Sequence, residues 1–148
     1  DGIVIDGRLM KRGDMSGPKS AQMVLQNPTV DTAVFEVARG GILREGLGYD
    51  RNDVAVVTNV AGDHLGLGGI DTLGQLANVK GVVVEAVPRA GSAVLNADDP
   101  LVRGMPRAGQ RVISFSLVDA GADYSLVDVP EPALSCRSGE PVPQNRAA

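Results

Sequence analysis

The sequence contains little of several residue types, and each shortage excludes a class of protein. A single cysteine, Cys136, excludes an internal disulfide framework and a cysteine-based zinc cluster. Lysine and arginine (14) are fewer than aspartate and glutamate (18), so a formal charge of −4 argues against binding to nucleic acid or anionic membranes. No apolar run approaches the roughly 20 residues that span a bilayer, and the first residues do not resemble a secretion signal. We therefore expect a cytoplasmic protein.

Aromatic residues are also scarce, since they make up 3% of the chain and tryptophan is missing, whereas glycine is abundant with 19 residues. Glycine permits tight turns and close backbone approaches. This balance is more typical of nucleotide-handling α/β domains than of binding modules lined by aromatic side chains. The length of 148 residues allows one compact domain.

The first thirty residues predict a hairpin followed by a helix. Asp6-Gly7 is a pair that two-residue hairpin turns favour, and short apolar runs flank it between positions 3 and 10. Ser16 is the expected N-cap of the helix, with Pro18 in its first turn. Asn27-Pro28 is expected to end that helix.

Strand and helix patterns then alternate, which predicts a parallel sheet. We expect a helix capped by Asp71 that runs to about Val87, and a short helix after 96–99. The expected fold class is α/β, a partial doubly wound, mostly parallel sheet with a small N-terminal hairpin. Four apolar runs are its predicted strands, at 32–37, 54–60, 93–95 and 112–115.

The character of the chain changes near residue 119. Prolines at 130, 132, 141 and 143 interrupt a polar stretch that cannot form a regular helix or a central strand. We therefore expect one partial domain over residues 1–118 and a proline-rich, disordered tail over 119–148.

Polar side chains follow two of the predicted strands. Glu36 ends the strand at 32–37, and Asn59, Asp63 and His64 follow the strand at 54–60. Ligands of open parallel sheets bind beyond the carboxyl ends of the strands, where a carboxylate and an imidazole could hold Mg²⁺. The alternative is an ordinary strand-end carboxylate and a loop histidine that binds the backbone.

Several ordered motifs over residues 1 to about 116 closely resemble the Mur-ligase-like central domain of the cyanophycin synthetase family. A segment at 58–66 and another at 96–100 are shared by Mur and folylpolyglutamate ligases in general, whereas 38–46 points more narrowly to cyanophycin synthetases. The motifs that carry the resemblance are Asp1-Gly2-Ile3, Gly13-Asp14-Met15-Ser16-Gly17-Pro18, Ala38-Arg39-Gly40-Gly41-Ile42-Leu43-Arg44-Glu45-Gly46, Thr58-Asn59-Val60-Ala61-Gly62-Asp63-His64 and Asn96-Ala97-Asp98-Asp99-Pro100.

The resemblance implies an ATP-dependent ligase that activates a carboxylate as an acyl phosphate, which an amine attacks to form an amide. For this family the carboxylate is the aspartate side chain of a growing polymer, and the amine is arginine. Glu36 and His64 are then implied as Mg²⁺ ligands, and Lys80 as a carbamylated lysine that bridges to the metal. The alternative for Lys80 is a solvated lysine on a helix face.

The resemblance also implies supporting residues. Arg39 and Arg44 could hold a substrate carboxylate or polyphosphate with their planar donors, or pair with nearby acidic residues instead. Asn59 and Asp63 are expected to orient the metal and cofactor site. Asp98 and Asp99 are expected to cap the short helix at 100.

The 148 residues contain no phosphate loop. The candidate at 13–20 fails because only three residues separate Gly13 from Gly17 and because Pro18 precedes Lys19. We expect a fragment of a larger ligase that also lacks the carboxy-terminal domain, is inactive alone and self-associates. A homo-oligomer is one option for the full-length form. The alternatives are a remnant that binds a metal or partner without turnover and a fragment of a peptidoglycan or folate ligase.

Overall fold

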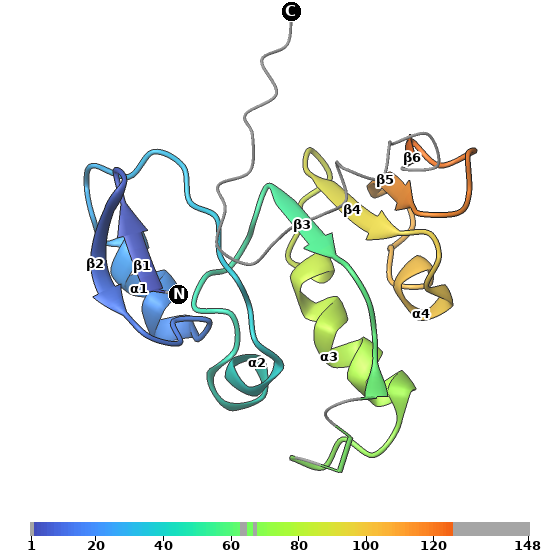
Figure 1. The fold of residues 1–148 in the computed structure, drawn as a ribbon, viewed down its shortest axis with the longest axis horizontal. Coiled ribbons are helices and arrows are strands. Elements are labelled where there is room, and N and C mark those ends of the chain that lie inside the picture. Colours follow the sequence, from blue (N-terminus) through green and yellow to red (C-terminus); the bar gives the residue numbers. More distant parts are fainter. Residues whose placement is uncertain (1, 63–64, 67, 126–148) are drawn as a thin grey trace, which may run out of the picture.

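The computed structural model describes residues 2–62, 65–66 and 68–125. A small hairpin with its helix lies on one side of the molecule, and a parallel sheet with its helices lies on the other (Figure 1). In chain order the elements are β1 (Gly2–Ile5), β2 (Arg8–Arg12), α1 (Pro18–Leu25), α2 (Arg39–Glu45), β3 (Val54–Val57), α3 (Leu73–Glu85), β4 (Ser92–Asn96), α4 (Pro100–Arg103), β5 (Arg111–Ser116) and β6 (Tyr124–Ser125).

The predicted hairpin is confirmed. Strands β1 and β2 pair antiparallel, and the pair at their turn, Asp6 and Gly7, has backbone φ angles of 50° and 71°. Two consecutive positive φ angles define the turn type that suits the twist of a hairpin, and aspartate and glycine tolerate them best. Strand β2 is exposed along its whole length, whereas Ile3 of β1 is buried.

Helix α1 begins where proline was expected, but its predicted cap is wrong. Gly17 is the N-cap, without a side-chain cap bond, and Pro18 is the first helical residue. The Ser16 hydroxyl instead donates to Asp14 Oδ1 at 2.6 Å. Ser16 thus binds the loop before the helix, one residue ahead of the N-cap position that Gly17 takes.

The predicted strand at 32–37 does not form. Its side chains alternate between exposed and partly buried, and Val34 is 95% exposed. A strand requires a partner for its backbone groups, and within the described part of the chain this segment pairs with no strand. The segment runs instead as an irregular connection from α1 to α2 (Figure 1).

The parallel sheet is confirmed, with its strands in the order β3-β4-β5-β6. The pairing of β3 with β4 sets Ala55 opposite Ala93 and Val57 opposite Leu95, and all four side chains are buried. Strand β3 ends at Val57, earlier than predicted. Strand β6 lies in the first residues of the predicted tail, where its two residues pair with the end of β5.

Helices α3 and α4 pack on the same face of the sheet and form the core with it. The side chains of Leu76, Val84 and Val102 are almost completely buried there. On the opposite face, Val54 and Val56 of β3 are 56% and 59% exposed. Helices α3 and α4 thus cover one face of the sheet, in keeping with the partial doubly wound sheet that the sequence predicts.

Helix α3 starts one residue later than predicted. Thr72, not Asp71, is the N-cap, and it forms a reciprocal capping box with Gln75. The threonine hydroxyl accepts from the Gln75 N–H, while the Gln75 side chain accepts from the Thr72 N–H at 3.0 Å. This box satisfies two N–H groups at once, those of Thr72 and Gln75.

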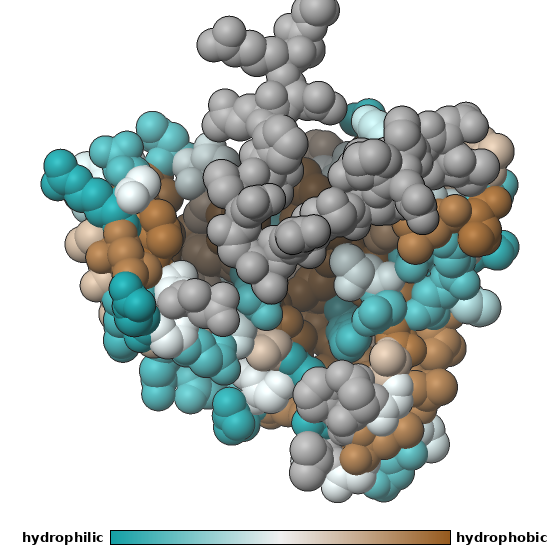
Figure 2. All heavy atoms as spheres, in the orientation of Figure 1, coloured by the Kyte–Doolittle hydropathy of each residue, from teal (hydrophilic) through white to brown (hydrophobic). Residues whose placement is uncertain are grey.

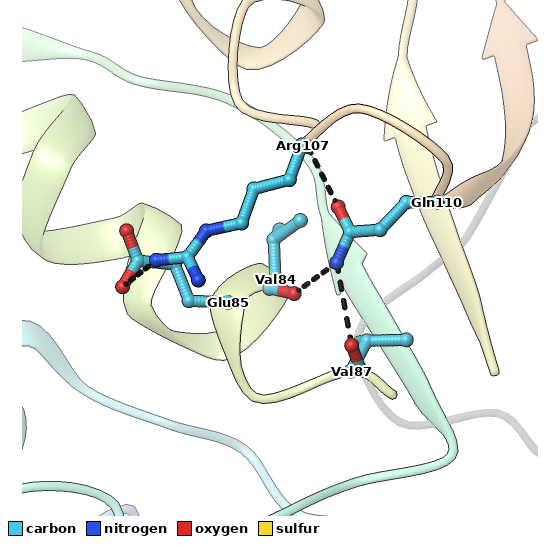
Figure 3. Close-up of polar contacts among 5 residues, drawn as sticks. All are labelled: Val84, Glu85, Val87, Arg107 and Gln110. Carbon is cyan, nitrogen blue, oxygen red and sulfur yellow. Dashed lines mark hydrogen bonds and ion pairs between the residues drawn. The ribbon is translucent and has the colours of Figure 1, made fainter. Parts of the chain in front are cut away.

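The last turn of α3 is bound by the loop before β5 (Figure 3). Gln110 Nε2 donates to the carbonyl oxygens of Val84, at 2.8 Å, and Val87, at 3.4 Å. The Gln110 Oε1 atom accepts from the backbone N–H of Arg107, whose guanidinium forms a 2.8 Å ion pair with Glu85. One amide side chain therefore binds two carbonyls at the end of α3, of which that of Val84 also accepts from the Val87 N–H at 3.1 Å.

Candidate functional site

A cleft of about 860 Å³ lies between the hairpin, α1 and the connection at 30–40, and Lys80 of α3 reaches its wall. In the space-filling view, apolar residues are recessed between the hairpin side and the sheet side (Figure 2). Three of the predicted site residues line this cleft, namely Glu36, Arg39 and Lys80. The structure therefore brings together residues that are separated by more than forty positions in the sequence.

The position of Glu36 depends on the connection that carries it. The ring of its neighbour Phe35 stacks on Tyr49, with centroids 5.9 Å apart and an angle of 25° between the planes. Such a pair contributes about 1 kcal/mol beyond burial of its area. The Glu36 side chain is exposed and lines the cleft, where its carboxylate can reach a ligand.

Arg39 is placed by close packing between α1 and α2. The backbone N–H of Ala38, the N-cap of α2, donates to the Ser16 carbonyl at 3.1 Å. A Cβ atom added at Gly41 would lie 3.1 Å from Pro18 Cδ, and one added at Gly48 would lie 2.5 Å from the Pro18 carbonyl oxygen. The glycines of this segment thus let two helices meet.

Arg39 and Lys80 also line a second, smaller cleft of about 200 Å³. One wall of this cleft is strand β3 with the two residues after it, including Asn59. Arg44 lines neither cleft, because it lies exposed in the last turn of α2. Among the predicted residues, Asp63 and His64 lie outside the described part of the chain.

The segment 58–60 after β3 connects the cleft to the sheet. Lys80 Nζ donates to the Asn59 carbonyl at 2.9 Å, and Asn96 Nδ2 donates to the Thr58 carbonyl at 2.8 Å. The Val60 N–H donates to Asp99 Oδ2 at 2.7 Å. Three consecutive residues therefore each have one backbone group bound by a side chain, and these side chains come from α3, the end of β4 and the start of α4.

Asp99 is a charged group at the centre of these contacts. Burial raises the pKa of its carboxyl group, but N–H bonds from Val60, Val102 and Leu101 and the positive charge of Lys80 outweigh burial, so its pKa is lowered. Asp99 also caps α4 as predicted.

The neighbouring Asp98 does not cap α4, although a cap was expected. Its carboxylate accepts from the Ser116 hydroxyl and from the Leu117 N–H at 2.7 Å. Asp98 therefore joins the start of α4 to the end of β5.

Sequence reasoning missed the contacts of the segment 58–60. The motif at 96–100 was interpreted as a helix start, and two adjacent aspartates suggested only caps. The available signal was that one cap needs one oxygen, whereas two carboxylates supply four. The surplus of acceptors indicated that these side chains bind further groups.

Comparisons with known proteins identify a family and several relatives of this chain. Residues 14–133 match the Mur ligase middle domain family. The chain is 60% identical over 105 residues to cyanophycin synthetase from Crocosphaera subtropica, covering 71% of this chain and 12% of that protein. It is 54% identical over 118 residues to cyanophycin synthetase from Synechocystis sp., covering 79% of this chain and 14% of that protein.

A more distant relative is UDP-N-acetylmuramoyl-L-alanyl-D-glutamate--2,6-diaminopimelate ligase from Chlamydia pneumoniae, with 28% identity over 87% of this chain and 26% of that protein. The chain belongs to the Mur ligase middle domain family, and this confirms the resemblance inferred from its motifs. It spans between 12% and 14% of the length of the two cyanophycin synthetases described above. Among the described residues, no helix is long and apolar enough to cross a membrane.

Proposed function

We propose that this chain forms part of an ATP-dependent ligase that joins an amine to a carboxylate, as cyanophycin synthetase does. The observation that carries the proposal is the cleft that gathers Glu36, Arg39 and Lys80 in a chain 60% identical to such a protein. A carboxylate oxygen attacks the terminal phosphorus of ATP, so that ADP leaves and an acyl phosphate forms. The amine then attacks the acyl carbon, phosphate leaves, and loss of a proton gives the amide.

The proposed substrates are an aspartate side-chain carboxylate on a polymer and arginine as the amine. Within the cleft, the guanidinium of Arg39 can bind a carboxylate or a phosphate through two parallel hydrogen bonds. The same cleft holds acidic Glu36 and Asp14, which can attract a cationic amine substrate. A wall with charges of both signs suits a reaction between an anion and a cation.

Mg²⁺ is the proposed metal, and the described residues fit it. Magnesium keeps several waters and is bound by one or two carboxylates together with substrate phosphates. Glu36 offers one exposed carboxylate in an open cleft. In the described residues, no group of three or more His, Cys, Asp and Glu side chains could enclose a metal, and a Mg²⁺ site of this kind does not need one. His64 is the further proposed ligand.

Bound Mg²⁺ would neutralise charge that develops on the phosphates. The chain's own residues perform the remaining tasks: Arg39 orients an anionic substrate, and Lys80 supplies an amine in the wall of the cleft. Asn59 and Asp63 are proposed to orient this site. Arg44 is proposed as an outer substrate contact, since it lies outside both clefts.

Lys80 is proposed to react with CO₂ during activation of the site. Its neutral amine attacks CO₂ and loses one proton, which forms a C–N bond and an oxygen-rich anion suited to Mg²⁺. One N–H remains on Nζ after this reaction. The hydrogen bond to the Asn59 carbonyl can therefore persist in both states.

The isolated 148 residues are proposed to be inactive as a ligase. A phosphate loop binds nucleotide phosphates through backbone N–H groups, and these residues contain no such pattern. In an assay of this chain alone, we expect no ADP release above background with arginine and an aspartate-ended acceptor. Clear release that depends on both substrates would contradict this.

The proposed function is tested on the polypeptide that carries this segment in its source cells, purified at its native length. We expect ADP release with arginine, and at least a hundredfold loss in Glu36→Gln, since the carboxylate would be replaced by a neutral amide. Glu85→Gln is the matched control, because Glu85 binds Arg107 and lines neither cleft. Full activity of Glu36→Gln, or turnover only with diaminopimelate, lysine or glutamate, would overturn the proposal.

A further inference from the structure

Beyond the cleft residues, the segment 58–60 carries an unusual set of contacts. Strand β3 ends at Val57, so the backbone groups that follow are not paired with β4. Each of the next three residues nevertheless has one backbone group bound to a side chain of another element. A loop whose polar groups are bound in succession loses the freedom to choose another path.

Asp99 divides its two oxygen atoms between two tasks. Oδ1 accepts from the N–H groups of Leu101, at 2.9 Å, and Val102, at 3.2 Å, and thereby caps α4. Oδ2 accepts from the Val60 N–H at 2.7 Å, across 39 positions of sequence. A cap alone needs a single oxygen, which serine or asparagine supplies equally well. The carboxylate is therefore explained by the second contact, with the segment 58–60.

The contact at Val60 also reaches Lys80. The Val60 N–H and the Asn59 carbonyl belong to the same peptide unit, which is planar. When Asp99 holds the N–H, the carbonyl points in the opposite direction, and Lys80 Nζ binds it there at 2.9 Å. The orientation of one peptide group thus couples Asp99 to the amine in the wall of the cleft.

We propose that Asp99 is a positioning residue for the ligase site, because it fixes the peptide unit between Asn59 and Val60 and thereby the place of Lys80 Nζ. The proposal rests on the function proposed above for Lys80. Asp99 lines neither of the two clefts, so its effect on catalysis is indirect. Its removal is expected to loosen Lys80 and the peptide unit after Asn59 and to leave Glu36 and Arg39 in place.

Asp99→Asn separates the two tasks of the side chain. Asparagine keeps one oxygen for the cap but replaces Oδ2 with an amino group, which cannot accept from the Val60 N–H. Asp98→Asn is the matched control, because the adjacent carboxylate accepts from Ser116 and Leu117 and not from the segment 58–60. Asp99→Ser is a second variant that also keeps only one oxygen.

The first measurement uses this chain itself and needs no ligase activity. Lysines are acetylated with acetic anhydride, and the rate at Lys80 is read by peptide mass spectrometry against Lys19, whose side chain is 83% exposed. We expect Lys80 to react more slowly than Lys19, and to react at least about threefold faster in Asp99→Asn and Asp99→Ser. The Val60 amide should exchange with solvent deuterium faster in both variants. In Asp98→Asn neither rate should change.

The second measurement uses the native-length polypeptide. We expect kcat to fall about tenfold in both Asp99 variants, with the KM for ATP within twofold, as for a misplaced catalytic group. Unchanged acetylation of Lys80 in both variants, or unchanged kcat despite faster acetylation, would overturn the proposal. Lack of ligase activity in the unsubstituted polypeptide would overturn the proposed function alone, since the acetylation rates still decide whether Asp99 positions Lys80.

Discussion

The two sides of this molecule are held together in different ways. In residues 54–125 a continuous cluster of buried side chains runs from Ala55 to Val102 and joins the sheet to α3 and α4. In residues 2–53 the buried hydrophobic side chains are Ile3, Ala21 and Leu47. That side relies instead on close approaches of glycine to Pro18 and on backbone hydrogen bonds.

The difference matters for the site, because its residues come from both sides. Lys80 lies on α3 beside the large core, whereas Glu36 and Arg39 lie on the side with few buried contacts. Regions with few buried apolar contacts open at lower free energy. The acidic and guanidinium groups of the cleft can therefore adjust to a ligand more readily than the lysine.

Leu76→Ala should have the largest effect on stability. Leu76 is 1% exposed within the core cluster, so its truncation leaves a cavity that costs about 2–5 kcal/mol of unfolding free energy. Leu25→Ala on α1 is the control, because that side chain is 51% exposed and should cost less than about 1 kcal/mol. Urea unfolding measures both. Equal costs would show that the two sides are packed alike.

Gly48→Ala should have the next largest effect, on the side that contains the glycine contacts. Its φ of +81° disfavours any side chain, and the new Cβ would lie 2.5 Å from the Pro18 carbonyl oxygen, so we expect a loss above about 2 kcal/mol. Gly109→Ala isolates the effect of the positive φ angle, because φ is +83° there and the space around the glycine is open. Similar losses in a urea titration would mean that close packing of α1 contributes little.

Gln110→Ala should cost about 1–2 kcal/mol, because it removes the donor to the carbonyls of Val84 and Val87 at the end of α3. Amide hydrogen exchange should accelerate in the last turn of α3 and remain unchanged in α1. Gln22→Ala, an exposed glutamine of α1, is the control with no expected change. Faster exchange in α1 of the Gln110 variant would show that both sides unfold as one unit.

The smallest expected effect is on the stability of the fold at acidic pH. Hydrogen bonds from the Ser116 hydroxyl and the Leu117 N–H hold the pKa of Asp98 below its usual range. A carboxyl group whose pKa is lowered by folding contributes stability above its unfolded pKa of about 4, and this is lost as the pH falls through the folded value. Asp98→Asn should therefore weaken the loss of stability below about pH 4.

The comparison for this test is Asp14, on the other side of the molecule. Bonds from the Ser16 hydroxyl and N–H also lower the pKa of Asp14, but they span only two positions and can persist when tertiary packing opens. Asp14→Asn should change the acid dependence less than Asp98→Asn. Thermal unfolding from pH 3 to pH 6 measures both, and an equal change in the two variants would contradict the expectation.

Local chemistry explains which parts of the fold the sequence predicts. The hairpin follows from Asp6-Gly7, and the start of α4 follows from Asp99 and Pro100, because those signals act over a few residues. The strand expected at 32–37 was wrong, since apolar alternation does not reveal whether a partner strand is present. The cap expected at Ser16 was wrong because Gly17, without a side-chain cap bond, takes the N-cap position. The cap expected at Asp71 was wrong because Thr72 and Gln75 form a reciprocal capping box.

The candidate site likewise has parts that the sequence predicts and parts that it does not. The structure places Glu36, Arg39 and Lys80, which the resemblance names, in the lining of one cleft, and their roles there are the proposal made above. The contact between Asp99 and Val60 spans 39 positions and depends on where β4 ends relative to β3. No local pattern encodes such a distance, so only the folded chain reveals it.

The order of strands in the sheet also bears on how the chain is made. Because β3, β4, β5 and β6 lie side by side in the order of the sequence, each strand pairs with the one that the ribosome released just before it. Among the described residues, the partners of each strand in this sheet are its neighbours in chain order, so its pairings reach no further than that of Val54 with Ser92. The sheet can therefore assemble one strand at a time during synthesis.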